Sequence, residues 1–222
     1  MHLQHFELDP SSRIIHMLWS VLQRDFMRLD AACHFQSGFT VRGKLDPQPK
    51  GGQLAMQLRD LREDGSIDMA GVQRFNLDLQ VDRYALQSGD VVFRSRGQPN
   101  FGYVVGAEMA EPIVALLPLI ILRPQAGVVA PDYLAWAINQ PDAQRQIDAE
   151  AQGQSLRMIP KGSLEGITIP VPDLSTQHAI VEVARLAAKE TALLHQLAER
   201  RTQFTGRVLA DLAQAGAQQK GL

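Results

Sequence analysis

A long stretch without proline near the C-terminal end constrains the fold of this chain more than any other feature. Between Thr176 and Ala213 there is no proline, and Gly206 is the only glycine. Apolar residues recur there at steps of three, four and seven residues, which is the spacing of a helix with one apolar stripe. At a rise of about 1.5 Å per residue, such a helix is on the order of 50 Å long. The stripe consists of Ile180, Val183, Ala187, Leu194, Leu197, Phe204 and Val208.

A helix of this length cannot bury its stripe against itself, and the sequence offers no second helical pattern of the same length. The spacing resembles the seam of a coiled coil. The simplest partner is the same helix of a second copy, packed antiparallel. The sequence therefore predicts a homodimer and assigns residues 173–222 to a long dimerisation or spacer helix.

The rest of the chain has the composition of a globular domain. Its 222 residues are 45% hydrophobic and 21% charged, which is ordinary for one core domain with an appended element. Residues 1–30 form a predicted N-terminal helical extension, because apolar residues recur at helical spacing from Ile14 to Phe26. Residues 31–172 form the predicted main domain.

Within the main domain, short strand candidates and Gly/Pro turns alternate up to about Leu122. The apolar run from Pro112 to Leu122 is too short to cross a bilayer, and it predicts one buried strand with an edge or bulge at Pro118. Residues from Pro131 to Ile147 predict one helix, whose Tyr133 and Trp136 we assign to the core. These patterns together predict a mixed α/β domain.

The stretch from Leu86 to Gly97 contains the most informative candidate site. A Ser-Gly-Asp turn signal leads into a β-branched and aromatic strand that ends in two arginines. Strand alternation predicts that both arginines project to one side, and Arg, Asn and Gln are the residues that read guanine and adenine edges. A solvated hairpin tip without a ligand is the alternative, since polar loop tips are common. The predicted DNA contacts here are Arg94, Ser95, Arg96, Gln98 and Asn100.

Two further segments carry candidate DNA contacts. Arg59 is a candidate, although it could instead pair with Asp60 or Asp64. The polar loop that leads to the C-terminal segment contains amide, hydroxyl and basic side chains that are suited to phosphate, with a structural role as the alternative. These residues are Gln154, Ser155, Arg157 and Lys161.

Several short motifs lie in order between about residue 30 and residue 212. They are FQSGFTVRGK at 35–44, Gly51-Gly52, MQLRDL at 56–61, the stretch 88–97, Tyr133-Leu134, GQS at 153–155, IPK at 159–161 and SLEGITIPVPDLSTQ at 163–177. Their order and spacing resemble the DNA-specificity (S) subunit of type I restriction-modification systems. This chain departs from the usual pattern at Asp173, where a proline is common, and at Ser175, where an acidic residue is usual. We expect these changes to alter the helix start and not the function.

The resemblance implies a half-sized S subunit with an α+β fold: one mixed α/β target-recognition domain, followed by the long C-terminal helix that pairs as a coiled coil. The implied partners are double-stranded DNA and a modification (methyltransferase) subunit, and the resemblance leaves open a restriction subunit. It implies no catalysis, because other subunits cut and methylate DNA. The alternative is a non-reading interaction protein or antagonist that competes for the methyltransferase through its helix.

The chemistry that the sequence lacks agrees with this interpretation. It contains no nucleophile elbow, P-loop or dinucleotide fingerprint, and its histidines fall at no metal-ligand spacing, so we predict no catalytic residues, cofactor or metal. Because Cys33 is the only cysteine of the sequence, an intramolecular disulfide is excluded. The first residues show no secretory signal, which predicts a cytoplasmic protein. The net charge of the chain is −2, but residues 83–103 contain three arginines (Arg83, Arg94 and Arg96) and only one acidic residue, Asp90. We therefore expect a locally basic surface, and weak DNA binding without partners.

Overall fold

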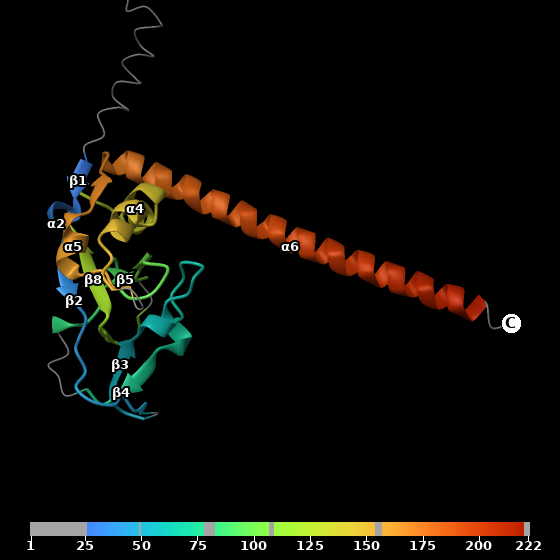
Figure 1. Cartoon of the computed structure of the whole chain (residues 1–222), viewed down its shortest axis with the longest axis horizontal. Helices are drawn as coiled ribbons and strands as arrows, with labels where there is room; N and C mark the ends of the chain where they lie inside the picture. The colour runs from blue at the N-terminus through green and yellow to red at the C-terminus, as the bar shows by residue number, and fades with distance from the viewer. Residues whose placement is uncertain (1–25, 49, 78–82, 107–108, 154–156, 220–222) are drawn as a thin grey trace, which may run out of the picture. The chain divides into compact units, whose positions relative to one another are not determined.

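A computed structural model describes residues 26–48, 50–77, 83–106, 109–153 and 157–219 of the chain. The chain divides into two compact units, residues 1–178 and residues 179–222, and each is described by itself. The first unit combines three small sheets with short helices (Figure 1). The second consists of most of one long helix. The predicted α+β class is confirmed.

The largest sheet has four strands in the order β2-β8-β5-β6, all antiparallel to their neighbours. Its central strand β8 begins with four apolar residues that are all buried, because it has partners on both edges. Val92 of β5 pairs with Ile121 of β8 and with Tyr103 of β6. The strands are β2 (Cys33–Ser37), β5 (Val91–Arg94), β6 (Gly102–Val104) and β8 (Leu119–Pro124).

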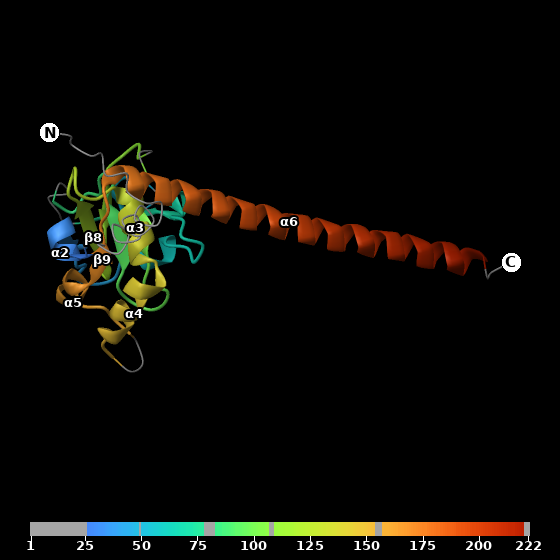
Figure 2. The ribbon, with the colours of Figure 1, turned by 90° about the horizontal axis from the view of Figure 1, so that it is seen from above.

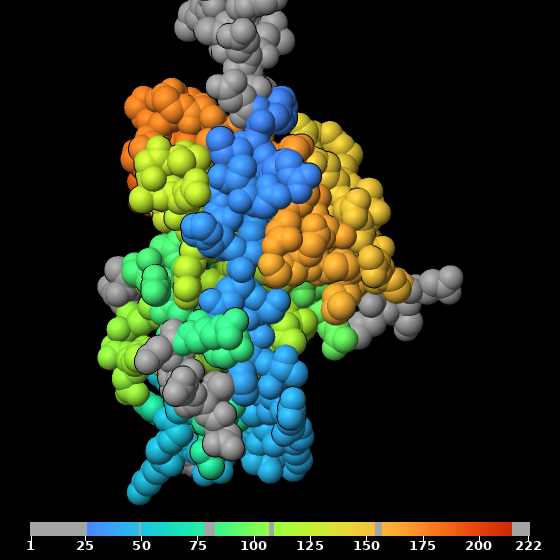
Figure 3. Space-filling model, turned by 90° about the vertical axis from the view of Figure 1, so that its left-hand side faces the viewer, coloured from blue at the N-terminus to red at the C-terminus, as the bar shows by residue number. Residues whose placement is uncertain are grey.

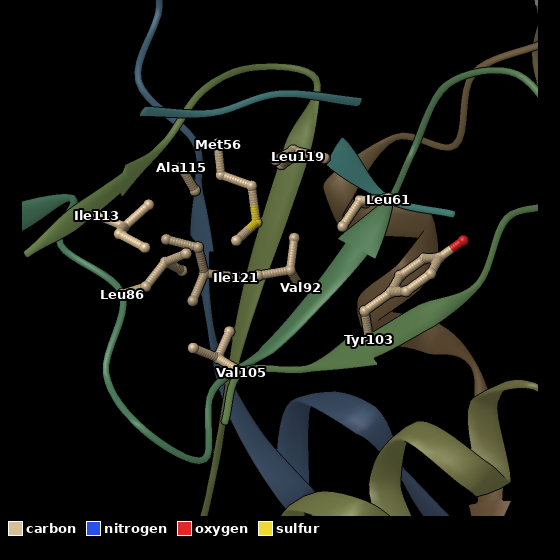
Figure 4. Packing of buried hydrophobic residues seen from close by; sticks show 10 residues of the cluster. All are labelled: Met56, Leu61, Leu86, Val92, Tyr103, Val105, Ile113, Ala115, Leu119 and Ile121. Atoms are coloured by element: carbon tan, nitrogen blue, oxygen red, sulfur yellow. The ribbon is translucent and has the colours of Figure 1, made fainter. Parts of the chain in front are cut away.

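A second sheet has the order β4-β3-β7, in which β3 (Gln53–Met56) and β4 (Gln73–Phe75) are antiparallel and β3 and β7 (Ile113–Ala115) are parallel. Successive side chains of β7 lie in two different clusters, as strand alternation requires. Ile113 and Ala115 belong to the main core, which joins residues of both sheets (Figure 4), and Val114 packs in a second cluster with Phe75. Two 3₁₀ turns, Leu58–Asp60 and Met69–Gly71, lie between these strands in the sequence.

The run from Pro112 to Leu122 was predicted as one strand, and this is wrong. It forms β7 and β8, which belong to different sheets, with a turn between them that the Leu119 N–H closes on the Leu116 carbonyl at 2.9 Å. Pro118 lies in this turn and has no N–H to give to a ladder. The apolar run continues because both strands are buried, and Leu117 at the turn is exposed.

The predicted helix from Pro131 to Ile147 is also wrong in one respect, because it is two helices, α3 (Pro131–Ile138) and α4 (Pro141–Ala149). Pro141 starts the second, since the residue before a proline is held in an extended conformation. Helix α3, which is labelled in Figure 2, packs on β6. The Asn139 side chain fixes this contact, accepting from the Gly102 N–H at 2.8 Å and donating to its carbonyl at 3.0 Å.

The predicted N-terminal helix does not continue to residue 30. Phe26–Arg28 form strand β1, which pairs with β9 (Thr168–Pro170), and a short helix α2 (Leu29–Ala32) follows. Helix α2 lies beside α5 (Lys161–Gly166), as Figure 1 shows. Residues 1–25 of the predicted extension lie outside the described residues. The long-range pairing with β9 overrides the local helical spacing at Phe26.

The predicted long helix is present as α6 (Leu174–Gln219), whose 46 residues correspond to about 69 Å. Its first turn belongs to the first unit and is joined to it by Gln177, which is fully buried. The Gln177 amide accepts from the Ala130 N–H at 2.8 Å and donates to the Val128 and Pro172 carbonyls at 2.9 and 2.7 Å. In the described part of the chain, no helix has the length and apolarity needed to span a membrane.

Asp173 caps the start of α6. Its carboxylate accepts from the Thr176 N–H at 3.0 Å and from the Ser175 and Thr176 hydroxyls at 2.6 and 2.7 Å, and these bonds hold the pKa of the carboxyl well below its usual range. Asp173 thus satisfies a backbone N–H at the start of α6. The proline that is common at this position in S subunits would leave that N–H to another group.

We expect Asp173→Ala to lower Tm by about 2–4 °C at pH 7, the shift typical for loss of one helix cap in a chain of this size. Because the folded pKa lies below the unfolded one, the cap contributes fully above the ordinary aspartate pKa of about 4. Its contribution is lost as the pH falls through the folded pKa. The difference in Tm between the wild type and Asp173→Ala should therefore shrink when thermal denaturation is followed from pH 7 to pH 2. Asp173→Asn keeps an acceptor oxygen, so its Tm should stay near that of the wild type at pH 7. An alanine variant with wild-type Tm at pH 7 would contradict the assignment.

Candidate nucleic-acid interface

The loop between β5 and β6 lies against the segment that precedes α5. The Gly97 N–H donates to the Arg157 carbonyl at 3.0 Å, and the Ile159 N–H donates to the Ser95 carbonyl at 2.8 Å. Arg96 forms an isolated β-bridge with Met158 between these two bonds. Two segments that are far apart in the sequence, and that both carry predicted DNA contacts, are therefore neighbours.

Two of the predicted contacts are buried and hold the loop. Ser95 and Asn100 are 4% and 3% exposed. The Ser95 hydroxyl donates to the Pro118 carbonyl, and the Asn100 amide donates to the Arg94 carbonyl at 2.9 Å. Because both side chains are almost fully buried and bond to backbone carbonyls, we do not retain them as base contacts, and their role here is to shape the loop.

The prediction that Arg94 and Arg96 project to the same side depended on strand alternation. Strand β5 ends at Arg94, so Arg96 lies outside it. The Arg94 Nε donates to the Arg96 carbonyl at 3.3 Å, and its guanidinium opposes the rise that burial produces in the pKa of Tyr103. Gln98 is exposed but lines a separate hollow with Glu63 and Asp148. Of the loop's predicted contacts, Ser95 and Arg96 line one of the hollows described below, and only Arg96 of these two is exposed.

Arg59 has two partners of its own. Its guanidinium donates to Gln73 Oε1 at 2.5 Å, and its Nε lies 3.9 Å from Asp60 Oδ1. The alternative of pairing with Asp60 is therefore present in the structure. Asp60 itself is buried, which raises its pKa, and its Oδ2 accepts from the Gln57 N–H at 2.7 Å. Arg59 keeps a half-exposed side chain.

The predicted phosphate contacts after residue 150 are partly paired. The Arg157 guanidinium lies 3.1 Å from an Asp148 carboxylate oxygen. Lys161 forms an ion pair with Glu165, and its Nζ lies 5.9 Å from the centre of the Phe35 ring. Gln154 and Ser155 lie outside the described residues. Arg157 is thus held against α4, whereas Lys161 lines two of the hollows.

Three hollows of about 1010, 430 and 320 Å³ share lining residues. Thr40 and Val41 belong to the first and second, Leu117 and Pro118 to the second and third, and Lys161 to the first and third. We call this continuous surface the concave face. Its described lining residues include five cations and no carboxylate, and the cations are Arg42, Arg59, Arg83, Arg96 and Lys161.

The largest hollow also contains aromatic rings. Phe39 and Tyr84 meet edge to face with ring centres 5.3 Å apart, and the Arg83 guanidinium lies 5.8 Å from the Tyr84 ring centre. Figure 3 shows the segment from β1 through β2 running down one side of the molecule, with α5 beside it. Cations above aromatic rings, next to further cations, form a surface that suits a nucleic-acid backbone and exposed base edges.

Arg42 and Arg83 were not among the predicted contacts, although both lie in segments that carry other predictions. Arg42 belongs to the FQSGFTVRGK motif, and Arg83 was considered only in the charge balance of residues 83–103. The close approach of residue 38 to the turn at 116–119 brings these segments together. A side chain at Gly38 would lie 2.7 Å from the Leu116 carbonyl carbon, so only glycine fits. A glycine directly after a strand was the available signal.

The described residues contain no group of three His, Cys, Asp or Glu side chains that could hold a metal ion. Cys33 is buried, which raises its pKa to about 12 and leaves the thiol protonated. The described surface therefore offers cationic side chains, which are suited to binding anions.

No protein-family model matches the sequence, and no curated protein gives a significant match. Solved structures do match. The S subunit of a type I restriction-modification system from M. genitalium is 14% identical with a TM-score of 0.51, over 72% of this chain and 38% of that one. The HsdS subunit from Thermoanaerobacter tengcongensis is 16% identical with a TM-score of 0.58, over 78% and 44%. A third, from work on assembly and conformational transition of the type I R-M system, is 17% identical with a TM-score of 0.57, over 83% and 49%.

The chain thus has the fold of a specificity subunit, and the predicted resemblance to S subunits of type I restriction-modification systems is confirmed. It spans less than half of the length of each of these structures. At this level of identity the comparison establishes the fold, and the residues of the concave face must carry any argument about function.

Proposed function

We propose that this chain is a non-catalytic DNA-specificity component of a type I restriction-modification-like system, in which the first unit reads one half-site of double-stranded DNA. The observation that carries the proposal is the concave face, where the described residues around three joined hollows include five cations and no carboxylate. The S-subunit fold supports the same function. Arg96 is the proposed base reader, and Lys161, Arg42, Arg83 and Arg59 are proposed phosphate contacts.

The net charge of −2 does not oppose this proposal, because none of the described residues that line the concave face is acidic. Asp90, the acidic residue nearest to the candidate loop in sequence, is 3% exposed and lies 3.3 Å from the Arg123 guanidinium. Phosphate binding depends on the local surface and on the counterions released from it. Five cations nevertheless form a modest footprint, so we expect weak binding by the chain alone.

We further propose that α6 pairs with α6 of a second copy and offers a docking surface for modification subunits. Its apolar residues Val183, Leu194, Leu197 and Phe204 are 57–68% exposed. Burying a leucine-sized side chain is worth roughly 1.5–3 kcal/mol, so an uncovered stripe of this kind is costly. Two copies related by a two-fold axis would read an inverted, bipartite site.

Binding measurements with and without the cognate modification subunit test this function. The chain alone should bind DNA weakly, with a slope of log K against log [salt] of about −0.9 for each phosphate contacted, and it should neither cut nor methylate DNA. Adding the modification subunit should tighten binding and steepen the slope. Metal-dependent cutting by the pure chain would overturn the proposal. Failure of the complex to bind any DNA site would favour the alternative of a non-reading antagonist.

We expect Arg96→Ala and Lys161→Ala to have different effects on the assembled complex. A bidentate arginine contact to a base discriminates by about 1–3 kcal/mol, so loss of Arg96 should relax the selected motif at one base position. Loss of the Lys161 phosphate contact should weaken binding evenly across sequences and reduce the salt slope by about 0.9. Selection from a random DNA library measures the motif, and titrations at several salt concentrations measure the slope. Unchanged motif and affinity in both variants would place the readers elsewhere.

A further inference from the structure

The seam of α6 contains two charged residues at positions where its spacing requires apolar ones. The steps of three and four residues that connect Ile180, Val183 and Ala187 continue through residues 190 and 201. These two positions are occupied by Glu190 and Arg201, which are both exposed. The charges therefore lie within the stripe and not on the opposite face of the helix.

Neither charge has an ionic partner on its own helix. Three and four residues from Glu190 lie only leucine and alanine side chains, and around Arg201 lie only leucine, alanine, phenylalanine and threonine. Among the described residues no ion pair includes either of them. Off the seam, by contrast, Glu182 and Arg185 form such a pair at 2.7 Å. Two unpaired opposite charges in an apolar stripe require partners on whatever covers that stripe.

We propose that the partner of α6 is α6 of a second copy, antiparallel and in one particular register, in which Glu190 of each copy meets Arg201 of the other. The inference rests on the proposed pairing of α6 and adds its register and its specificity. The neighbouring layers then follow from the heptad spacing. Val183 meets Val208, Ala187 meets Phe204, and Leu194 meets Leu197, each with its counterpart on the second copy.

The other registers leave the charges without partners. A shift by one heptad in either direction places Glu190 opposite Leu194 or Val208, and places Arg201 opposite Val183 or Leu197. A parallel pair places Glu190 against Glu190 and Arg201 against Arg201. Both results are unfavourable, because a desolvated charge needs an opposite charge and like charges repel.

Side-chain size supports the same register. The smallest residue of the seam, Ala187, meets the largest, Phe204, so the layer fills without a void or a clash. Beside the seam, Leu186 and Leu193 approach Arg207 and Arg200 of the second copy. The aliphatic parts of arginine side chains can cover leucines while the guanidinium groups remain in water.

The register gives the ion pair a role in partner choice. Buried polar pairs at seam positions select partner and orientation in coiled coils more than they add stability. A helix with an apolar seam throughout would leave Glu190 and Arg201 unpaired. The charges therefore favour a second copy of this chain over an unrelated helix.

Charge reversal in the full chain tests the proposal. In Glu190→Arg both symmetric contacts become Arg–Arg, and in Arg201→Glu both become Glu–Glu. Like-charge contacts cost several kcal/mol, so each variant should dimerise at least about 100-fold more weakly and sediment as a monomer near 10 μM. An equimolar mixture should regain the dimer, because both contacts of the mixed pair are Arg–Glu. The double variant Glu190→Arg/Arg201→Glu should also dimerise.

Matched reversals off the seam serve as controls. Glu199→Arg and Lys189→Glu change charge by the same amounts on the same helix and should leave the dimer intact. Circular dichroism checks that every variant remains helical. A wild-type dimer that persists in both seam variants would overturn the register while leaving the proposed pairing standing. A wild-type monomer at these concentrations would overturn the pairing itself, and the register with it.

Cross-linking tests the direction of the helices independently. Val183→Cys mixed with Val208→Cys should be joined by a short thiol-specific cross-linker, whereas Val183→Cys alone should not be joined to itself. The native Cys33 is 2% exposed and gives little background. Efficient self-linking of Val183→Cys would indicate parallel helices and would overturn the proposal.

Discussion

Replacing Leu194 with aspartate is expected to convert the proposed dimer into a monomer. Leu194 is 57% exposed in the single chain and lies at the middle of the α6 seam. Because the dimer is symmetric, one substitution removes two leucines from the interface and inserts two carboxylates. Loss of two buried leucines alone is worth roughly 3–6 kcal/mol, or about a 10²- to 10⁴-fold weaker association.

Sedimentation equilibrium or light scattering over a range of concentrations measures this change. Leu209→Asp is the matched control, because Leu209 is similarly exposed at 60%, lies on the same helix and is off the seam. It should leave the association unchanged. Equal loss of association in both variants would show that the aspartate disturbs the helix and not the seam. A dimer that survives Leu194→Asp would mean that another surface holds the copies together.

The local periodicity of the sequence predicted those elements that depend on few distant contacts. The long helix was predicted because nothing between Thr176 and Ala213 breaks it. The strand at Val91–Arg94 was predicted from a turn signal followed by β-branched residues. Both assignments follow from the local sequence alone, and the structure confirms both.

The errors lie where two elements share one apolar run or one helical spacing. Burial makes β7 and β8 equally apolar, so hydrophobicity could not show that the chain changes sheets at Leu117. Helices α3 and α4 have compatible apolar spacing, and Pro141 was the signal of the break. Phe26 joins a strand because β9, far along the chain, is available to pair with it.

The candidate site shows a similar division. The sequence selected the segments that meet at the concave face, including the residues Arg59, Arg96 and Lys161. It could not separate exposed from buried polar residues within one loop, so Ser95 and Asn100 were chosen with Arg96 although they bond to backbone carbonyls. That distinction depends on the turn at Pro118 and on the course of β5, which no local pattern specifies.

Removing three cations of the largest hollow together is expected to produce the largest loss of DNA binding. Arg42, Arg83 and Lys161 come from three separate segments and line one hollow of about 1010 Å³, whose described lining residues include no carboxylate. Their replacement by alanine should reduce the magnitude of the salt slope by about 0.9 for each phosphate contact, or about 2.7 in all. The affinity at low salt should fall on the order of 10- to 100-fold, because unscreened contacts contribute most there.

Titrations of labelled DNA at several salt concentrations, with the assembled complex, give both quantities. The matched control is Arg62→Ala, Arg74→Ala and Arg145→Ala together, which changes the net charge equally. Each of these three arginines pairs with a carboxylate, on Asp68, Glu111 and Asp142 respectively, and none lines the concave face. Loss of general positive charge would change both triple variants alike. If the concave face binds phosphate, only the variant that lacks Arg42, Arg83 and Lys161 should have a reduced salt slope. Equal salt slopes in the two triple variants would show that DNA approaches another surface.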